Sequence, residues 1–382
     1  MLADPPMARP IQTLHPKFRK DGAFRQDLQV RVDQYFENTQ QSRRDLPAMF
    51  GKTAVIFAWF ALSWAGLVFG NPPWPLAILL AISLGLAMGA IGMSVMHDAN
   101  HSGYSRFAWV NRALGWSLDF LGCSSYIWRV KHNQIHHTWT NLDGVDDDLQ
   151  VGPLARLAPT QPWHAWHRGQ QWYAWLLYAL LLPKWLLIDD WYNLATRRVG
   201  STPFPLPKPR AWIALVAGKL CYVTWALVIP LMLHPVLPTL GLWLLASGVT
   251  GLVLSTTFQL AHCVGNVDFP PPGEAFQHDF AEHQLATTAD FARDNRAVNW
   301  LMGGLNFQVV HHLFPKVCHL HYRAISQILA ETAADHGVQY RVHGSLSDAI
   351  LVHFRWLKRM GKPVLSADQT LSTHAADLST AG

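Results

Sequence analysis

Four long apolar stretches, arranged as two pairs, constrain this sequence more than any other feature. They cover about residues 53–70, 76–95, 211–232 and 240–261. At about 1.5 Å per residue, each can cross the roughly 30 Å hydrocarbon core of a bilayer. Only NPPWP separates the first pair and only HPVLPT the second. Since a chain inside lipid must satisfy its own backbone hydrogen bonds, the sequence predicts two helical hairpins that cross a membrane.

The basic residues predict which side of the membrane the hairpin ends share. Of the thirty Lys and Arg, twenty-nine lie before residue 53, between residues 97 and 210, or after residue 261. Only Lys219 lies inside an apolar stretch, and neither turn contains a basic residue. Because Lys and Arg are enriched on the cytoplasmic side, we expect both termini and the long middle segment there. Residues 1–52 are polar and basic, which indicates a cytoplasmic N-terminal segment rather than a signal peptide.

The middle segment contains two further apolar runs, residues 109–128 and 172–187. Arg112, Asp119 and Lys184 interrupt these runs, and tryptophans lie at their edges. This pattern favours helices that lie in the membrane interface, with a third hairpin as the alternative. Half of the residues are apolar and 14% are charged, a balance typical of a partly embedded protein. Residues 366–382 are polar and small, and they indicate a disordered tail.

Three histidine motifs predict a metal centre on the same side as the basic residues. We call them the first box (HDANH, 97–101), the second box (HNQIHH, 132–137) and the third box (QVVHH, 308–312). Residues four apart lie on one face of a helix, so His97 pairs with His101 and His132 pairs with His136. The remaining box histidines are His137, His311 and His312. The first box begins directly after an apolar stretch, which predicts a centre just beyond the lipid headgroups.

The number of imidazoles indicates two metal ions. Neutral imidazole suits iron, zinc, copper and nickel alike. A zinc site takes four ligands, or three and a water, whereas the seven box histidines and His262 supply enough for two metals. Soluble di-iron bundles use Glu-x-x-His motifs, and none of the four glutamates here stands three residues before a histidine. An all-nitrogen pair of irons fits the sequence best.

Other polar residues near the boxes are candidates for weaker roles. Gln308 begins the third box, Asp98 lies inside the first, and His283 precedes the third in sequence. Each is a possible ligand or a hydrogen-bond partner of a ligand. The acidic run 143–148 follows the second box, and it could accept from the ring N–H opposite the metal or form a solvated loop. The four cysteines form no CxxC pair, so we expect electrons to come from another protein.

The three boxes, in this order around two hairpins, resemble the integral-membrane fatty acid desaturases. HDANH, HNQIHHTWTN and QVVHHLFP carry the resemblance. The glutamine at position 308, together with RVDQYFENTQQSRRD and TTADFARDNRAVNWLMGGLNFQ, resembles the front-end branch and the bacterial linoleoyl-CoA desaturase type. The match covers roughly residues 25–362, which places a desaturase domain at about residues 53–365.

The resemblance implies a dinuclear iron centre that uses dioxygen to insert a cis double bond into a long acyl chain. It implies that the seven box histidines and His262 are the metal ligands. The acyl carrier would be coenzyme A, a carrier protein or a lipid, and the electron donor an external ferredoxin or cytochrome with its reductase. The His-Pro-Gly-Gly motif of the cytochrome domain fused to many front-end enzymes does not occur in this sequence. A bacterial inner membrane is the expected location.

Two other functions stay open at this point. An acyl or lipid hydroxylase on the same scaffold would use the same boxes, and only the product distinguishes it. A zinc-binding membrane transporter would also be rich in histidine, but it needs polar groups in the middle of the membrane. The apolar stretches contain almost none beyond Lys219. The overall prediction is an all-α membrane protein with four membrane helices, interfacial helices and a cytoplasmic, histidine-rich helical cap.

Overall fold

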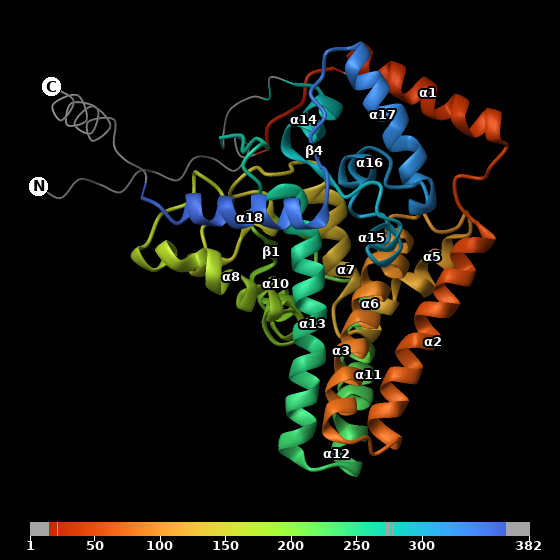
Figure 1. Ribbon diagram of the computed structural model, residues 1–382, viewed down its shortest axis with the longest axis vertical. Coiled ribbons are helices and arrows are strands. Elements are labelled where there is room, and N and C mark those ends of the chain that lie inside the picture. Colours follow the sequence, from red (N-terminus) through yellow and green to blue (C-terminus); the bar gives the residue numbers. More distant parts are fainter. Residues whose placement is uncertain (1–14, 21, 272–275, 277, 364–382) are drawn as a thin grey trace, which may run out of the picture.

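Two helical hairpins form the membrane part of the molecule. The computed structural model describes residues 15–20, 22–271, 276 and 278–363. In this part of the chain, four helices are long and apolar enough to cross a membrane: Pro47–Phe69, Trp74–Asn100, Pro209–Leu233 and Val236–His262. They occupy the lower half of Figure 1, with the two turns at the bottom and the cap above. The predicted fold class and the two hairpins are therefore confirmed.

Two of the membrane helices contain π-helical turns. The first hairpin consists of α2 (Pro47–Phe69) and of α3 (Trp74–Ala90), which continues through the π-helical η2 (Ile91–Met96) into α4 (His97–Asn100). The second hairpin begins with α11 (Pro209–Val223), η8 (Thr224–Val228) and α12 (Ile229–Leu233), and it returns as α13 (Val236–His262). The continuous helix that begins with α3 therefore carries His97 in its last turn, and α13 ends at His262.

Helices α3 and α13 pack closely because small residues line their contact. A Cβ atom at Gly85 would lie 2.5 Å from the Ala246 carbonyl oxygen, which only glycine allows. The Thr250 hydroxyl donates to the Gly85 carbonyl at 3.0 Å and joins the two helices directly. A Cβ atom at Gly92 would meet Leu254 Cδ2 at 3.0 Å. This close approach is the usual means of helix association in lipid, where burial of apolar surface gives little driving force.

The connection between the hairpins consists of short elements. Neither apolar run within it forms one of the four membrane helices in the described chain, so the alternative of a third hairpin is not supported. Helix α8 lies against α13 near the cap (Figure 1). The elements in order are α5 (Ala108–Gly115), α6 (Ser117–Phe120), α7 (Ser125–Trp128), η3 (Arg129–His136), η4 (Asp147–Leu149), η5 (Gly152–Leu154), η6 (Ala165–Gly169), α8 (Gln170–Ala179), α9 (Leu181–Lys184), η7 (Trp185–Asp189), α10 (Asp190–Thr196), and the antiparallel pair β1 (Arg198–Val199) and β2 (Thr202–Pro203).

The cap is completed by the N-terminal helix and the segment after α13. Helix α1 (Ala23–Thr39) places Phe24, Leu28 and Val32 at four-residue spacing against Ile325 and Leu329 of α17. Strands β3 and β4 pair in parallel, with Asp290 opposite Val342. The remaining elements are α14 (Phe280–Thr287), β3 (Asp290–Phe291), α15 (Arg296–Leu301), α16 (Gln308–Leu313), η9 (His319–His321), α17 (Tyr322–Asp335), β4 (Val342–His343) and α18 (Leu346–Met360). The predicted tail at residues 366–382 lies outside the described residues.

A buried ion pair fixes the connection between the hairpins to a membrane helix. Lys219 lies on α11, and its Nζ is 2.9 Å from Asp190 Oδ2 at the start of α10. The same ammonium donates to the carbonyl oxygens of Gly122 and Leu186 at 3.0 and 3.1 Å. Asp190 also accepts the Ser124 N–H. The single basic residue inside an apolar stretch is therefore a structural anchor for α10 and for the loop before α7.

Replacing Lys219 should destabilise the protein strongly, because Asp190 would remain buried without its partner. We expect Lys219→Met to lower the free energy of unfolding by about 3 kcal/mol or more. Thermal unfolding of the purified protein in detergent would measure the loss, and Asp190→Asn in the same chain should recover part of it.

Lys184→Met is the matched control. Lys184 pairs with Asp189 on the same segment at 2.8 Å, but its side chain is 46% exposed, so its loss should cost less than about 1 kcal/mol. Equal unfolding temperatures for the two Met variants would contradict an anchoring role for Lys219.

Candidate metal centre

The first and second boxes meet at the cap end of the helix that begins at Trp74. His97 opens α4 and His101 follows it as the C-terminal cap, and both side chains are buried. Their ring centroids are 4.8 Å apart, as the four-residue spacing predicts. The ring of Trp128, at the end of α7, lies against both at 5.5 and 5.6 Å. His132 contributes a third ring, 5.2 Å from His97 and 5.2 Å from His101.

The second box is π-helical, which adds a contact to the expected pairing of its histidines. The rings of His132 and His136 stack with centroids 5.2 Å apart, as the four-residue spacing predicts. The backbone N–H of His137 donates to the carbonyl of His132 at 3.0 Å, a bond between residues five apart. His132 Nε2 also lies 3.2 Å from His137 Nε2. The other side of the His136 ring faces Asp146 and α13, with its centroid 4.7 Å from that of His262.

The third box and the last residue of α13 complete the cluster. Helix α16 carries His311 and His312, and His262 is the final residue of α13. The ring of His311 lies 4.4 Å from that of His97, and the ring of His312 lies 5.0 Å from that of His262. All eight predicted ligand histidines are therefore brought into one buried cluster from four different parts of the chain.

The eight imidazoles divide into two groups that could each hold one metal ion. In each group the ligand nitrogens lie within 4.8 Å of one another. The first group is His97, His101, His132 and His311, and the second is His136, His262 and His312. His137 lies between them, with its Nε2 next to His132 Nε2 and its ring stacked at 4.4 Å on that of His312.

The nitrogen atoms of the cluster fit bound cations. His132 Nε2 lies 3.2 Å from Nε2 of both His97 and His137. A ring nitrogen carries either one proton or one lone pair, so these three atoms cannot all be paired by hydrogen bonds. In the described part of the chain, His101 Nε2 and His311 Nε2 are buried and have no hydrogen-bond partner. Buried, unpaired imidazole nitrogens that face one another are a donor set that suits transition-metal ions such as iron, zinc or copper.

Three residues outside the boxes hold the rings in the tautomer that a metal needs. Asp146 lies 3.0 Å from His136 Nδ1, Gln284 Oε1 lies 2.7 Å from His312 Nδ1, and the Tyr322 hydroxyl lies 3.2 Å from His311 Nδ1. A proton on each Nδ1 that faces a carboxylate or amide oxygen leaves Nε2 free as a ligand. The acidic run predicted this role for Asp146. Gln284 and Tyr322 were missed, because single residues on α14 and α17 carry no sequence signal for it.

Burial keeps most of these imidazoles neutral. Burial lowers the pKa of His132 to about 4. Burial and then the neighbouring imidazoles lower the pKa values of His137, His311 and His312 well below the ordinary value. Burial also opposes the charge on His136, but the Asp146 carboxylate outweighs it and raises the pKa of that ring. Neutral rings are the form that binds a metal.

The other candidate residues occupy different positions. Gln308 lies beside the second group, with its amide nitrogen 3.3 Å from His262 Nε2, while its Oε1 is buried without a partner in the described chain. Nitrogen and oxygen of this amide are interchangeable by a flip, which would point the oxygen at the metal. His283 is buried against Phe18 and Phe276 rather than against the box rings.

Asp98 belongs to a separate buried cluster. Its Oδ2 lies 2.9 Å from Nδ1 of His319, and Nε2 of that ring lies 2.9 Å from the Lys52 ammonium. Asp98, Cys318 and His319 have atoms close enough together to hold a metal ion. The Lys52 charge occupies the same place and repels a cation, so the cluster is better described as a buried ion pair bridged by an imidazole.

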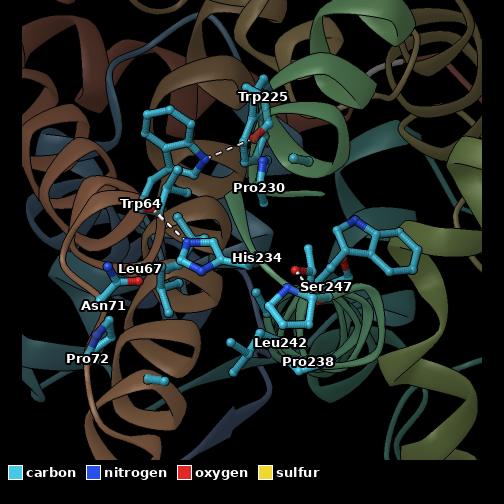
Figure 2. A pocket seen from close by; sticks show the side chains of 18 of the residues that line it. Trp64, Leu67, Asn71, Pro72, Trp225, Pro230, His234, Pro238, Leu242 and Ser247 are labelled. Atoms are coloured by element: carbon cyan, nitrogen blue, oxygen red, sulfur yellow. Dashed lines mark hydrogen bonds between the residues drawn. The ribbon is translucent and has the colours of Figure 1, made fainter. Parts of the chain in front are cut away.

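Two cavities lie near the cluster and between the hairpins. A small one, of about 100 Å³, reaches His132, and its lining combines the aromatic Trp128, Trp185 and Phe258 with charged residues such as Lys131 and Asp148. The larger, of about 470 Å³, lies between the two hairpins on the side of their turns. Figure 2 shows Trp64, Leu67, Trp225 and Leu242 around it, with the Trp64 indole donating to the Trp225 carbonyl at 3.0 Å. Its lining is suited to a hydrocarbon chain.

Comparisons with known proteins agree with this geometry. Residues 71–344 match the family model described as fatty acid desaturase. The chain is 38% identical to a sn-1 linoleoyl-lipid 6-desaturase of Arthrospira platensis, over 90% of this chain and 94% of the relative. It is 37% identical to a sn-1 linoleoyl-lipid 6-desaturase of a Synechocystis strain, over 91% of this chain and 98% of the relative. An acyl-lipid (8-3)-desaturase of Physcomitrium patens is 33% identical over 87% of this chain and 71% of the relative.

Removing the charge that faces His136 should weaken metal binding. We expect Asp146→Asn to lower the metal affinity of the protein by about 10-fold to 100-fold, because the carboxylate fixes the tautomer and raises the basicity of the ring. Iron retained during dialysis against a graded chelator series, measured by plasma mass spectrometry, would report the change.

Asp143→Asn is the control from the same acidic run. Asp143 accepts from Gln150 and Thr160 and contacts no box imidazole, so this variant should retain iron like the wild type. Equal retention by both variants would mean that Asp146 does not support a ligand.

Proposed function

Because this chain belongs to the fatty acid desaturase family and to its front-end branch, it is an oxygen-dependent acyl desaturase, and we propose that two iron ions are its cofactor. The observation that carries the proposal is the pair of buried imidazole groups, which use six box histidines and His262, with His137 between them. His97, His101, His132 and His311 would hold one iron, and His136, His262 and His312 the other. His137 would complete either sphere, and Gln308 would approach the second iron through its amide oxygen.

The protein residues around the irons select and position the substrate. When bound, the irons supply the reduction of dioxygen and the removal of two hydrogens from neighbouring methylene groups. Since the CH₂ groups of a chain are chemically alike, the choice of bond is geometric. Trp128 covers the rings of His97 and His101, and it lines the small cavity at His132 together with Trp185. We infer that these side chains hold the reacting part of the acyl chain and exclude water.

The cavity between the hairpins is suited to the methyl end of the same chain. It contains Met88, which lies nine positions before His97 on one continuous helix, or about 13 Å along its axis. A long acyl chain that passes the irons can reach this distance with its final carbons. Residues of the two turns, including Pro72 and His234, form part of its lining (Figure 2). The cavity would therefore hold the carbons that lie beyond the oxidised bond.

The substrate we propose is a linoleoyl chain esterified to a membrane lipid, with the new cis double bond at carbon 6. The support is that two relatives with this name match almost their whole length at 37% and 38% identity. A hydroxylase on the same scaffold is the second candidate, since the metal ligands do not separate the two reactions. The transporter alternative is set aside by the family membership.

Electrons would come from an external ferredoxin or cytochrome with its reductase. The four cysteines are free in the structure, and three of them are buried. None is arranged to hold an iron–sulfur group, since the described metal-binding clusters contain at most one cysteine. The protein therefore needs a partner that docks on the cap, where the imidazole cluster is closest to water.

We also propose that the cap and both termini lie on the cytoplasmic face of a bacterial inner membrane. The support is the distribution of Lys and Arg, which avoids both turns and leaves only Lys219 inside an apolar stretch. All three boxes lie on the same side of the four helices as these basic residues.

The proposed reaction leads to two predictions, one on the metal content of the protein and one on its product. Purified protein should contain about two irons per chain. Given a linoleoyl lipid, dioxygen and a donor with its reductase, it should form an alkene two mass units lighter, with the new bond at carbon 6 by mass spectrometry. His136→Ala should abolish turnover and still insert into membranes. A hydroxylated product, turnover without the donor, or full activity with stoichiometric zinc would each refute the proposal.

The orientation predicts which segments are reachable from the cytoplasm. A cysteine-reactive or epitope tag placed between Pro153 and Pro162 should be labelled only from the cytoplasmic side, whereas tags in the turns at residues 71–75 and 234–239 should be labelled only from the other side. Intact cells and inverted vesicles provide the two measurements. A cytoplasmic label at either turn would exclude this arrangement.

A further inference from the structure

A large groove on the cap side of the membrane helices is not used by the centre described above. It has a volume of about 1040 Å³ and lies between α5 to α7 on one side and α11 on the other. Its floor is mostly apolar, and the residues that form it include Trp116, Phe120, Ala214 and Ala217. One whole side is a face of α11 from Arg210 to Cys221, so the groove runs along a helix that crosses the membrane. It therefore opens toward lipid rather than only toward water.

Three arginines, Arg112, Arg129 and Arg210, line this groove. None of them takes part in an ion pair within the part of the chain that the structure describes. The lining holds one carboxyl, Asp119, which is buried, accepts the Ser125 N–H at 3.3 Å and attracts the Arg129 charge from a longer distance. Three guanidinium groups against one carboxyl give the groove an excess of positive charge beside its apolar surface.

The position of Arg129 joins the groove to the metal centre. Its guanidinium donates to Asn100 Oδ1 at 2.8 Å, and the Asn100 carbonyl accepts from Asn133 at 2.9 Å. Asn100 directly precedes His101 of the first box, and Asn133 directly follows His132 of the second. An anion held by Arg129 therefore lies at a fixed place relative to the helical turns that carry two predicted ligands.

We propose that this groove seats a glycerophospholipid, with its phosphate on Arg112, Arg129 and Arg210 and its acyl part along α11, and that this lipid is the substrate. Arginine pairs with phosphate through two parallel hydrogen bonds, which suits three guanidinium groups around one headgroup. A membrane lipid fits better than a water-soluble acyl coenzyme A. Arg210 lies in the first turn of a membrane helix, and the groove continues along that helix. The inference rests on the proposed function and adds the class of headgroup to it.

The seat also explains how a double bond can be counted from the carboxyl end. The ester of a seated lipid is held near the turns that carry His101 and His132, whereas the methyl end lies free until it reaches the cavity between the hairpins. A short, fixed distance between the ester and the irons places the first few carbons of the chain at the centre. The arginines are therefore positioning residues for the reaction.

The test compares three carriers of the same linoleoyl chain: phosphatidylglycerol, a neutral galactosyl diacylglycerol and coenzyme A. The iron-loaded enzyme is assayed as wild type and as the double variant Arg112→Gln and Arg210→Gln, which leaves the Arg129–Asn100 contact intact. Lys208→Gln is the control, because it removes a charge at the same end of α11 from a residue that does not line the groove. KM and kcat are measured for each carrier, and retained lipid is measured without turnover by native mass spectrometry.

In the double variant we expect KM for phosphatidylglycerol to rise about tenfold with little change in kcat, and retained phosphatidylglycerol to fall to the same degree. KM for the neutral lipid should stay unchanged, and Lys208→Gln should behave as wild type. Unchanged retention and KM in the double variant, or an equal rise for the neutral lipid, would overturn the phosphate seat. A rise confined to the thioester would assign the arginines to coenzyme A and overturn the lipid. If the wild type forms no alkene from any carrier but retains phosphatidylglycerol through these arginines, the seat stands and the proposed reaction fails.

Discussion

The burial of eight imidazoles against one another is the constraint on which the rest of the structure depends. Each imidazole ring has two nitrogens. A buried nitrogen that has neither a hydrogen-bond partner nor a metal ion lowers the stability of the folded protein. Asp146, Gln284 and Tyr322 satisfy one side of three rings, and they come from the loop after the second box, from α14 and from α17. The cap must therefore fold completely around the boxes before their inner nitrogens face one another. The membrane hairpins position two further rings. The helix Trp74–Asn100 carries His97 near its cap end, and the helix Val236–His262 ends at His262.

The π-helical turn of the second box distributes its three histidines over the two metal groups. In an α-helix, His132 and His136 would share one face and His137 would point elsewhere. The bond from His137 to His132 widens the turn, so that His132 and His137 lie together while His136 faces His262 and Asp146. One six-residue motif can thus serve two ions. A second π-helical segment, Ile91–Met96, directly precedes His97, so a widened turn leads into the first box and another forms most of the second.

Much of this arrangement could be predicted from the sequence, for physical reasons that differ between its parts. The length of the apolar stretches and the short turns between them predict the hairpins. A chain inside lipid must satisfy its own backbone hydrogen bonds, and a helix does so. Histidine spacing identified seven of the residues that meet in the buried cluster, and His262 was found through its place at the end of an apolar stretch. The partner of Asp98 was not predicted, since His319 lies more than two hundred residues away and is joined to it only by the folded cap. The same holds for Gln284, and for Arg112 and Arg210, which come to line one groove only when α11 lies beside α5 to α7. Hydropathy also places the start of the first membrane helix too late. The predicted stretch begins at residue 53, whereas the helix begins at Pro47.

The contact at Gly85 joins α3 and α13 closely. The two backbones touch there, and Thr250 bonds across the contact, so neither helix can slide or rotate without the other. Bilayers differ in thickness, and membrane helices respond by changing their tilt. If the two helices tilt together, His97 and His262 move together. The distance between the two imidazole groups then does not depend on the thickness of the bilayer.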